Sequence, residues 1–136
     1  MISYPARFTE DDDGWCVEFP DLEGCLTQGE NLEEAKWMAQ DALSLYLESL
    51  DSRKIYIPEP SNIQGEDIIY ISPRLNVSFA ITIKHQREKL GLTQKQVAEK
   101  AGIKWAFYQR IENPRRSNPT LATIEKVQNA LGLSCF

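Results

Sequence analysis

The sequence has no long apolar run and no leader pattern. Its longest uncharged apolar stretch, around residues 68–71, is far shorter than the roughly 20 residues of a membrane-spanning helix. The first residues, MISYP, do not place a basic stretch before an apolar one, as a secretory signal does. The composition, with 42% hydrophobic and 26% charged residues among 136, is typical of a soluble globular chain. We expect a cytoplasmic protein with no membrane partner, folded as one ordinary domain or two small ones.

Cysteine and histidine are also scarce. The three cysteines, Cys16, Cys25 and Cys135, cannot all pair within one chain and show no CxxC spacing, which argues against a disulfide framework or a structural zinc site. We expect them to be small buried side chains. The single histidine, His85, is expected at a solvated helix position, so the sequence offers no Cys-His or Ser-His-Asp arrangement for catalysis. No cofactor is expected.

Charge is divided unequally along the chain. Residues 1–72 hold 16 acidic and 4 basic residues, a balance of −12, whereas residues 73–136 hold 4 acidic and 11 basic residues, a balance of +7. This partition predicts two domains, 1–72 and 73–136, that face different partners, with a polyanion as the partner of the basic half. Each half is small enough to be marginally stable alone, which favours self-association.

The acidic half is predicted to be a small antiparallel sheet covered by one helix. Apolar and polar residues alternate over residues 4–8 and 15–19, and the acidic turn between them ends in Gly14, so these segments should form a hairpin. Pro5 cannot donate to a sheet, which places the first strand at an edge or a bulge. Residues 25–28 predict a third strand, and residues 55–57 and 67–71 predict further extended segments.

A helix is predicted after the third strand. Asn31 can cap its first turn, and Glu34 can complete a capping box. Its apolar residues recur every three or four positions and form one stripe that should lie on the sheet. They are Leu32, Ala35, Ala39, Ala42, Leu43, Tyr46, Leu47 and Leu50.

Residues 1–60 resemble the HicB antitoxins. The resemblance rests on Tyr4-Pro5, Gly14-Trp15, the run FPDLEGCLTQG at residues 19–29, Glu33-Glu34-Ala35 and Ile57-Pro58-Glu59-Pro60. It implies a partial RNase-H-like fold without nuclease activity. It also implies a protein partner, a small HicA-type toxin that cleaves mRNA and has a double-stranded-RNA-binding-like fold.

The carboxylates do not predict a metal-dependent nuclease. Asp11, Asp12 and Asp13 are consecutive, so their side chains should point apart on a solvated turn rather than converge on a cation. Glu18 and Glu23 could in principle complete a site, but nothing in the spacing requires the carboxylates to converge. We therefore expect no enzyme activity and no metal site.

An acidic surface could instead occupy the cations with which a toxin holds RNA phosphates. Such an interface also needs apolar anchors at its centre. Trp15, beside the acidic hairpin, and Leu22, flanked by Asp21 and Glu23 on a turn expected to be exposed, are the candidates for toxin binding. Both apolar residues are also compatible with positions in the core.

The basic half predicts a helix-turn-helix. Residues 78–90 predict a helix that ends at Gly91, and Thr93 with Gln96 forms a second capping box, followed by a short helix that stops at Gly102. Helical spacing restarts over residues 104–112, with Phe107, Tyr108 and Ile111 facing inward. Ala98 fits a close crossing of two helices.

Residues 79–133 resemble the phage-repressor-like (Cro/C1 or XRE-type) helix-turn-helix family. The matching positions are Gln94, Ala98, Gly102, Ile103, Arg110 to Asn113, Pro119 to Ile124, Val127 and Ala130 to Leu133. Tyr108 replaces a branched aliphatic residue and Pro114 replaces a frequent glycine. Some HicB chains carry such a C-terminal domain, so the two resemblances support each other.

In such a motif the second helix lies in the major groove, so Trp105, Ala106 and Gln109 should read bases. Gln109 can pair with adenine and Ala106 can touch a thymine methyl. Trp105 has one donor and no acceptor, and both packing on DNA and packing on protein stay open. Phosphate contacts are expected from a separate set that positions the protein. These residues are Gln94, Lys104, Arg110, Arg115 and Arg116. Arg110 could instead form a salt bridge within the domain, in the neighbourhood of Glu112 or with Glu99.

The sequence as a whole predicts an α+β domain joined to an all-α domain, in an antitoxin that binds and neutralises a HicA-type mRNA interferase. The protein should bind double-stranded operator DNA and repress its own operon, as a dimer or tetramer, with dimer half-sites about 34 Å apart. The alternative is a one-component transcriptional regulator with a ligand-sensing N-terminal domain.

Overall fold

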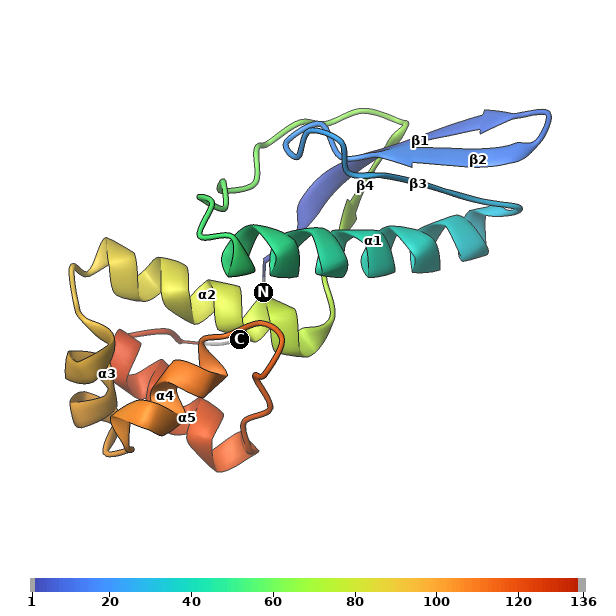
Figure 1. Ribbon diagram of the computed structural model, residues 1–136. Coiled ribbons are helices and arrows are strands. Elements are labelled where there is room, and N and C mark those ends of the chain that lie inside the picture. Colours follow the sequence, from blue (N-terminus) through green and yellow to red (C-terminus); the bar gives the residue numbers. More distant parts are fainter. Residues whose placement is uncertain (1, 135–136) are drawn as a thin grey trace. The chain divides into compact units, whose positions relative to one another are not determined.

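The computed structural model describes residues 2–134 and divides the chain into two compact units. The N-terminal unit is Ile2–Arg74, and the C-terminal unit begins at Leu75. The first contains a four-stranded antiparallel sheet and one long helix, and the second contains four helices (Figure 1). The fold is thus α+β followed by all-α, as the sequence predicts. Among the described helices, none combines the length and the apolar character that crossing a bilayer requires.

The sheet of the N-terminal unit has the order β3-β2-β1-β4. Strand β1 (Tyr4–Asp11) pairs with β2 (Gly14–Glu18) across the acidic turn, and β2 pairs with β3 (Leu26–Gly29). Strand β4 (Ile68–Ile71) returns from far along the sequence to pair with β1. Residues 55–57, expected to be extended, form no strand of this sheet.

Pro5 lies within an inner strand that pairs continuously with β4, so the prediction of an edge or a bulge is wrong. The register nevertheless explains why proline is tolerated there. Phe8 donates its N–H to the carbonyl of Asp67, so alternate residues of β1 bond to β4, and Pro5, opposite Tyr70, is not one of them. The imide nitrogen of Pro5 faces the side where β2 has already ended, because β2 pairs with β1 only from Arg7 onward.

Helix α1 (Leu32–Ser52) lies across one face of the sheet (Figure 1). Asn31 Oδ1 accepts the backbone N–H of Glu34 at 2.8 Å, and the Glu34 carboxylate accepts the N–H of Glu30 at 3.1 Å, one residue earlier than a standard capping box. The predicted stripe is buried at Ala35, Ala39, Leu43, Leu47 and Leu50. Burial of this stripe joins the helix to the sheet.

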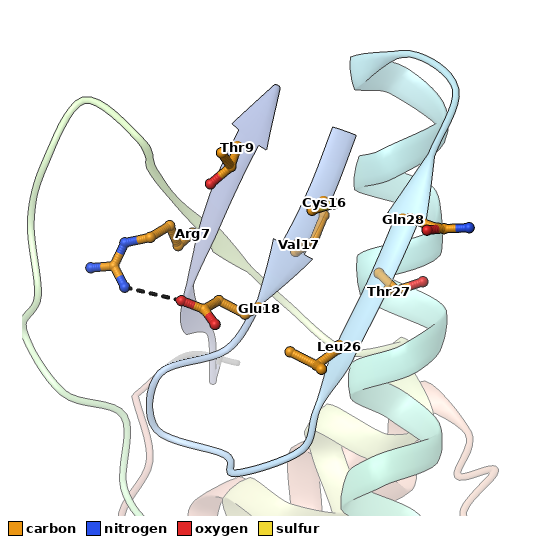
Figure 2. A pocket seen from close by; sticks show the side chains of 8 residues that line it. All are labelled: Arg7, Thr9, Cys16, Val17, Glu18, Leu26, Thr27 and Gln28. Carbon is orange, nitrogen blue, oxygen red and sulfur yellow. Dashed lines mark hydrogen bonds and ion pairs between the residues drawn. The ribbon is translucent and has the colours of Figure 1, made fainter. Parts of the chain in front are cut away.

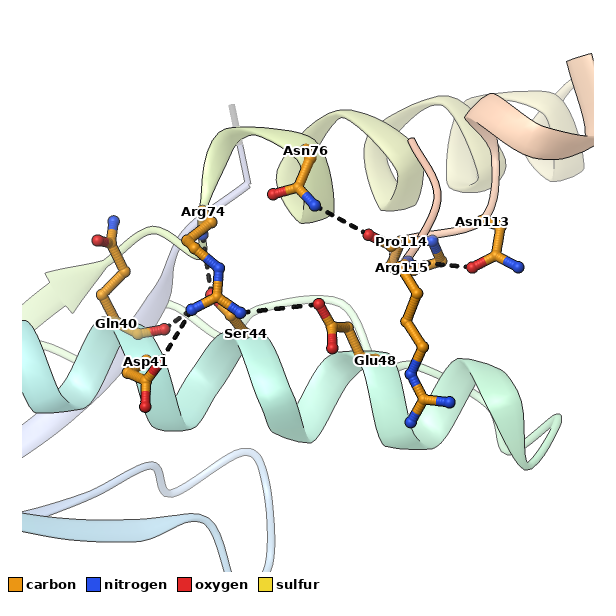
Figure 3. Close-up of polar contacts among 9 residues, drawn as sticks. All are labelled: Gln40, Asp41, Ser44, Glu48, Arg74, Asn76, Asn113, Pro114 and Arg115. Atoms are coloured by element: carbon orange, nitrogen blue, oxygen red, sulfur yellow. Dashed lines mark hydrogen bonds and ion pairs between the residues drawn. The ribbon is translucent and has the colours of Figure 1, made fainter. Parts of the chain in front are cut away.

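The segment after β4 is tied to α1 by Arg74. The guanidinium of Arg74 lies 2.9 Å from the carboxylate of Asp41 and 3.7 Å from that of Glu48, and its backbone N–H donates to Ser44 Oγ at 2.9 Å (Figure 3). Gln40 also donates to the carbonyl of Ser72 at 3.1 Å. Several side chains of one helix face therefore hold the last residues of the N-terminal unit in place.

The C-terminal unit packs four helices around one apolar cluster that includes Phe79, Ile83, Val97, Tyr108 and Leu131. The helices are α2 (Leu75–Lys89), α3 (Gln94–Ala101), α4 (Trp105–Ile111) and α5 (Leu121–Leu131). Asn76 on α2 donates to the carbonyl of Pro114 at 3.0 Å, and Asn113 Oδ1 accepts the N–H of Arg115 (Figure 3). These contacts shape the loop that follows α4.

The turn between α3 and α4 forms as the sequence predicts. Thr93 Oγ1 accepts the N–H of Gln96, while Gln96 Oε1 accepts the N–H of Thr93, so the capping box is complete. Gly102 ends α3 with a φ of 71°, a left-handed conformation that glycine adopts without a Cβ clash. Ala98 is buried in the core, as a close crossing of helices requires.

Candidate functional site

Helix α4 presents one buried face and one exposed face. Tyr108 and Ile111 are fully buried, and the three residues expected to read bases, Trp105, Ala106 and Gln109, lie on the exposed side. Phe107 is only half-buried, although the sequence predicted it in the inward set. The exposed side of α4 is therefore available to a partner and is not used in the core of its unit.

Trp105 has a neighbour within the C-terminal unit. Its side chain is 49% exposed, and the Lys95 ammonium lies 5.8 Å from its ring centroid. Both residues line a hollow of about 430 Å³ that Gln94 and Arg87 also border. Trp105 thus carries a cation on its ring at the surface, an arrangement that suits a contact with an anionic partner.

The cations expected at phosphates lie at the surface. Lys104, Arg110, Arg115 and Arg116 are all exposed. The guanidinium of Arg110 lies 6.0 Å from the ring centroid of Phe107. This packing holds the Arg110 side chain along α4 without removing its charge from solvent.

Gln94 belongs to a polar network that sequence reasoning missed. Its side-chain N–H donates to Glu112 Oε1 at 3.0 Å, and the same carboxylate forms two hydrogen bonds with Arg87, at 2.8 and 2.7 Å. Arg87 also donates to the carbonyl of Leu92 at 3.0 Å. One amide N–H of Gln94 is thereby used inside the protein, and the ion pair connects α2 to the end of α4.

The network is largely buried, which strengthens its electrostatics. The Glu112 side chain is 3% exposed and that of Arg87 is 15% exposed. The hydrogen bonds that Arg87 donates to Glu112 raise the pKa of Arg87, against the opposing effect of desolvation. Burial, followed by the charge of Glu112, raises the pKa of the Tyr108 hydroxyl. Arg87 and Glu112 are 25 residues apart, so no local spacing in the sequence could have indicated the pair.

Two of the four candidate toxin-binding residues have structural roles in the N-terminal unit. Leu22 is only 2% exposed, so its expected place on an exposed turn is wrong, because its side chain fills the core. Asp21 accepts the backbone N–H of Ser61 at 2.8 Å and so holds the 58–61 segment. Glu23 is exposed and Trp15 is half-buried, which leaves these two side chains at the surface.

Trp15 borders an acidic hollow of about 470 Å³. Its lining includes Met38 and the carboxylates of Asp11, Asp13, Glu30 and Glu34. Asp11 also accepts the N–H of Asp13 at 2.8 Å, which stabilises the hairpin turn. No group of three or more His, Cys, Asp and Glu side chains that could hold a metal ion occurs within residues 2–134.

Two cysteines differ in environment. Cys25 is buried, as expected, and burial raises the pKa of its thiol to about 11. Cys16 is exposed, contrary to expectation, because it lies on the sheet face that α1 does not cover, and a hydrogen bond to Asp11 raises the pKa of its thiol. Cys135 lies outside the described residues.

His85, expected to be solvated, is half-buried on α2.

The uncovered face of β1, β2 and β3 forms a second hollow, of about 490 Å³ (Figure 2). The guanidinium of Arg7 on β1 lies 3.3 Å from the carboxylate of Glu18 on β2 and 3.1 Å from that of Asp67, which directly precedes β4. Leu26 is exposed beside Glu18 in the same cross-strand row. Glu18 is thus engaged with a cation of its own unit.

Comparisons with known proteins give one consistent family. Residues 3–81 match the model described as a HicB-like antitoxin of bacterial toxin-antitoxin systems, and residues 83–135 match a helix-turn-helix model. "Antitoxin HicB 1" of Photorhabdus laumondii is 35% identical over 96% of this chain and 83% of its own length. "Antitoxin HicB 2" of the same organism is 31% identical over 96% of this chain and 91% of its own length.

Solved structures similar to this chain include two complexes. A chain of the "HicA3 and HicB3 toxin-antitoxin complex" aligns with a TM-score of 0.42 and 20% identity, over 53% of this chain and 98% of its own length. A chain of the "Toxin-Antitoxin complex from Streptococcus pneumoniae" aligns with a TM-score of 0.46 and 22% identity, over 74% of this chain and 95% of its own length. The family assignment rests on the sequence matches: the chain belongs to the HicB-like antitoxin family and carries a C-terminal helix-turn-helix domain of the XRE type.

Proposed function

We propose that this protein is an antitoxin that binds and neutralises a HicA-type mRNA interferase with its N-terminal unit. Its C-terminal unit binds operator DNA and represses the operon that encodes both proteins. In this proposal the protein acts by binding and not by catalysis. The names of its curated relatives and the acidic N-terminal half support the first part, and the helix-turn-helix match and the basic C-terminal half support the second.

The observation that carries the DNA-binding part is the exposed face of α4. Its base-reading candidates, Trp105, Ala106 and Gln109, lie on the face opposite the buried Tyr108 and Ile111. Exposed cations occur at both ends of the same helix, in Lys104 before it and in Arg115 and Arg116 after it. A short helix with base-contacting side chains and flanking cations is the arrangement with which a helix-turn-helix reads a major groove.

The toxin-binding part is supported by charge. A protein that cleaves mRNA must present cations to phosphates, and an acidic partner can occupy those cations. Trp15 borders a hollow lined by four carboxylates, so it can supply apolar and aromatic contact area next to them. We propose Trp15 and the exposed Glu23 as toxin contacts, and we assign Asp21 and Leu22 to the framework that holds this region.

The DNA-binding part is tested by measuring affinity for the promoter of the operon over a range of salt concentrations. Arg115→Ala and Arg116→Ala should weaken binding to all sequences and reduce the slope of log K against log salt by about one for each phosphate that is no longer neutralised. Gln109→Ala should instead relax the preference at one base pair, by about 1–3 kcal/mol. Lys36→Ala, an exposed cation of the N-terminal unit, is the matched control and should change nothing. An unchanged slope in both arginine variants would remove these residues from the interface.

The toxin-binding part is tested by co-purification with the ribonuclease encoded beside this gene and by inhibition of its RNA cleavage. Trp15→Ala and Glu23→Lys should each weaken inhibition at least tenfold while the far-UV circular dichroism stays unchanged. Glu66→Lys makes the same charge change at another exposed position of the N-terminal unit and should have little effect. If the wild-type protein binds the operator but neither binds nor inhibits the ribonuclease, the one-component regulator is the better explanation.

A further inference from the structure

Lys95 and Trp105 connect the starts of the two helices of the helix-turn-helix. Lys95 is the second residue of α3 and Trp105 is the first residue of α4, and the Lys95 ammonium lies 5.8 Å from the centroid of the indole ring. Both side chains are exposed. A cation at this distance from an indole is attracted by the negative face of the ring. The pair therefore links α3 to α4 at the surface, outside the apolar cluster of their unit.

Lys95 has no acidic partner. Within residues 2–134 it forms no ion pair, although the exposed Glu99 lies about one turn further along α3. The first turn of α3 contains no acidic residue, and none lines the hollow beside Trp105. Arg87, the other cation of that hollow, is already held in the buried ion pair. The positive charge of Lys95 is thus not neutralised by any carboxylate in the part of the chain that the structure describes.

The hydrogen-bonding groups of Trp105 do not suit base reading. The indole carries one N–H donor and no acceptor, whereas the side chains that discriminate best between base pairs form two hydrogen bonds at once. Ala106 and Gln109 lie on the same exposed side of α4 and supply a methyl contact and a donor–acceptor pair. Trp105 offers instead a flat ring over which a cation already lies.

We infer that Lys95 contacts a DNA phosphate and that Trp105 is the positioning residue that holds it there. This inference rests on the proposed DNA-binding function. In a helix-turn-helix the first helix crosses the phosphate backbone while the start of the second meets base edges, so a lysine on α3 beside the start of α4 faces the phosphates that flank the groove. A free lysine side chain loses rotamer entropy when it binds, and the Trp105 ring reduces that loss because it already restricts the ammonium.

The charge of this surface selects DNA over the toxin as the partner. Residues 73–136 have a balance of +7, and Lys95, Lys104 and Arg110 are exposed cations on or next to the two helices. A cationic toxin would be repelled by them, whereas a phosphate backbone releases counterions when they bind it. Lys95 thus belongs with the phosphate-contacting residues, and Trp105 acts through Lys95 and not through a base.

The role of Lys95 is tested with the full-length chain, the promoter duplex of the operon and an unrelated duplex of equal length, over a range of salt concentrations. Lys95→Ala should weaken binding to both duplexes about fivefold at physiological salt and reduce the slope of log K against log salt by about 0.9. Lys100→Ala removes a cation five residues further along α3, on another side of the helix, and should leave the slope unchanged. Partial unfolding lowers the active fraction of the protein but not this slope, so the slope separates a phosphate contact from a structural role.

A double-mutant cycle tests the role of Trp105. Trp105→Leu removes the aromatic face and should weaken binding to both duplexes about threefold, whereas Trp105→Phe retains a ring and should bind within about twofold of wild type. In the Lys95→Ala background, Trp105→Leu should have almost no further effect, because the group that the ring positions is absent. Trp105→Leu should also keep the wild-type preference at every operator base pair, whereas Gln109→Ala loses it at one.

Two results would overturn the inference while the proposed function stands. One is operator binding by Lys95→Ala with the wild-type salt slope. The other is a Trp105→Leu variant that loses the preference at one base pair and costs the same affinity with and without Lys95, because Trp105 would then read a base. If the wild-type chain binds neither duplex at any salt concentration, the DNA-binding part of the proposed function fails and the inference fails with it.

Discussion

Removal of Arg87 tests whether the buried ion pair holds the helix-turn-helix together. In Arg87→Ala, Glu112 keeps the hydrogen bond from Gln94 but loses both bonds from the guanidinium. The carboxylate is 3% exposed in the intact pair, so it is removed from bulk water and depends on these hydrogen bonds. Removing one member of a buried pair costs about 3–5 kcal/mol, which is comparable to the whole stability of a domain of this size, about 3–9 kcal/mol.

We therefore expect Arg87→Ala to unfold most of the C-terminal unit at 37 °C and to abolish operator binding. The assay is urea denaturation followed by far-UV circular dichroism, with operator affinity measured in parallel. Lys100→Ala removes an exposed cation from the same unit and should cost less than about 0.5 kcal/mol.

A double-mutant cycle separates the ion pair from other effects of the substitution. Arg87→Met combined with Glu112→Met replaces both charges by apolar side chains and should recover at least half of the stability that either single variant loses. Two results would show that the ion pair is not what stabilises the unit. One is a loss of less than about 1 kcal/mol in Arg87→Ala, and the other is a double variant whose loss of stability equals the sum of the losses in Arg87→Met and Glu112→Met.

Three further predictions concern the N-terminal unit. Gly29→Ala should destabilise the unit by about 1–3 kcal/mol, because the new Cβ would overlap the α1 backbone. Gly24→Ala, at a φ of 82° with open space around it, should destabilise the unit by about 1 kcal/mol, and thermal unfolding of the two variants checks both values. Burial raises the pKa of the Cys25 thiol to about 11 in the folded protein, above its unfolded value near 8.5. The protonated thiol therefore contributes to the free energy of unfolding fully below pH 8.5, and this contribution is lost as pH rises toward 11. The unfolding free energy of the wild type should therefore fall between pH 8 and pH 10.5 by on the order of 2 kcal/mol more than that of Cys25→Ala. Asp11→Asn should speed alkylation of Cys16 at pH 8, measured by peptide mass spectrometry, because the hydrogen bond and charge that raise its thiol pKa would be removed; an unchanged rate would contradict that cause.

Much of the fold could be predicted from the sequence because its signals are local. The caps at Asn31 and Thr93 involve residues three positions away, and the stop at Gly102 depends on one residue's backbone. The apolar stripe of α1 follows from helix periodicity, and the exposed side of α4 follows from the burial of Tyr108 and Ile111. Residues 55–57 form no strand of the sheet, because an apolar, β-branched segment forms a strand only when a neighbouring strand is free to pair with it.

Only the tertiary structure decided which distant residues meet. Leu22 lies between two acidic residues in the sequence, yet packing of the turn places it in the core, and Asp21 is bound to a segment 40 residues away. The Arg87 and Glu112 pair joins helices 25 residues apart. The sequence by itself determined the helices, their caps and the division of charge, since hydrogen bonds and periodicity within a few residues suffice for these. Which strand is left at the edge, and which surface side chains are already engaged within the protein, depended on how those elements pack.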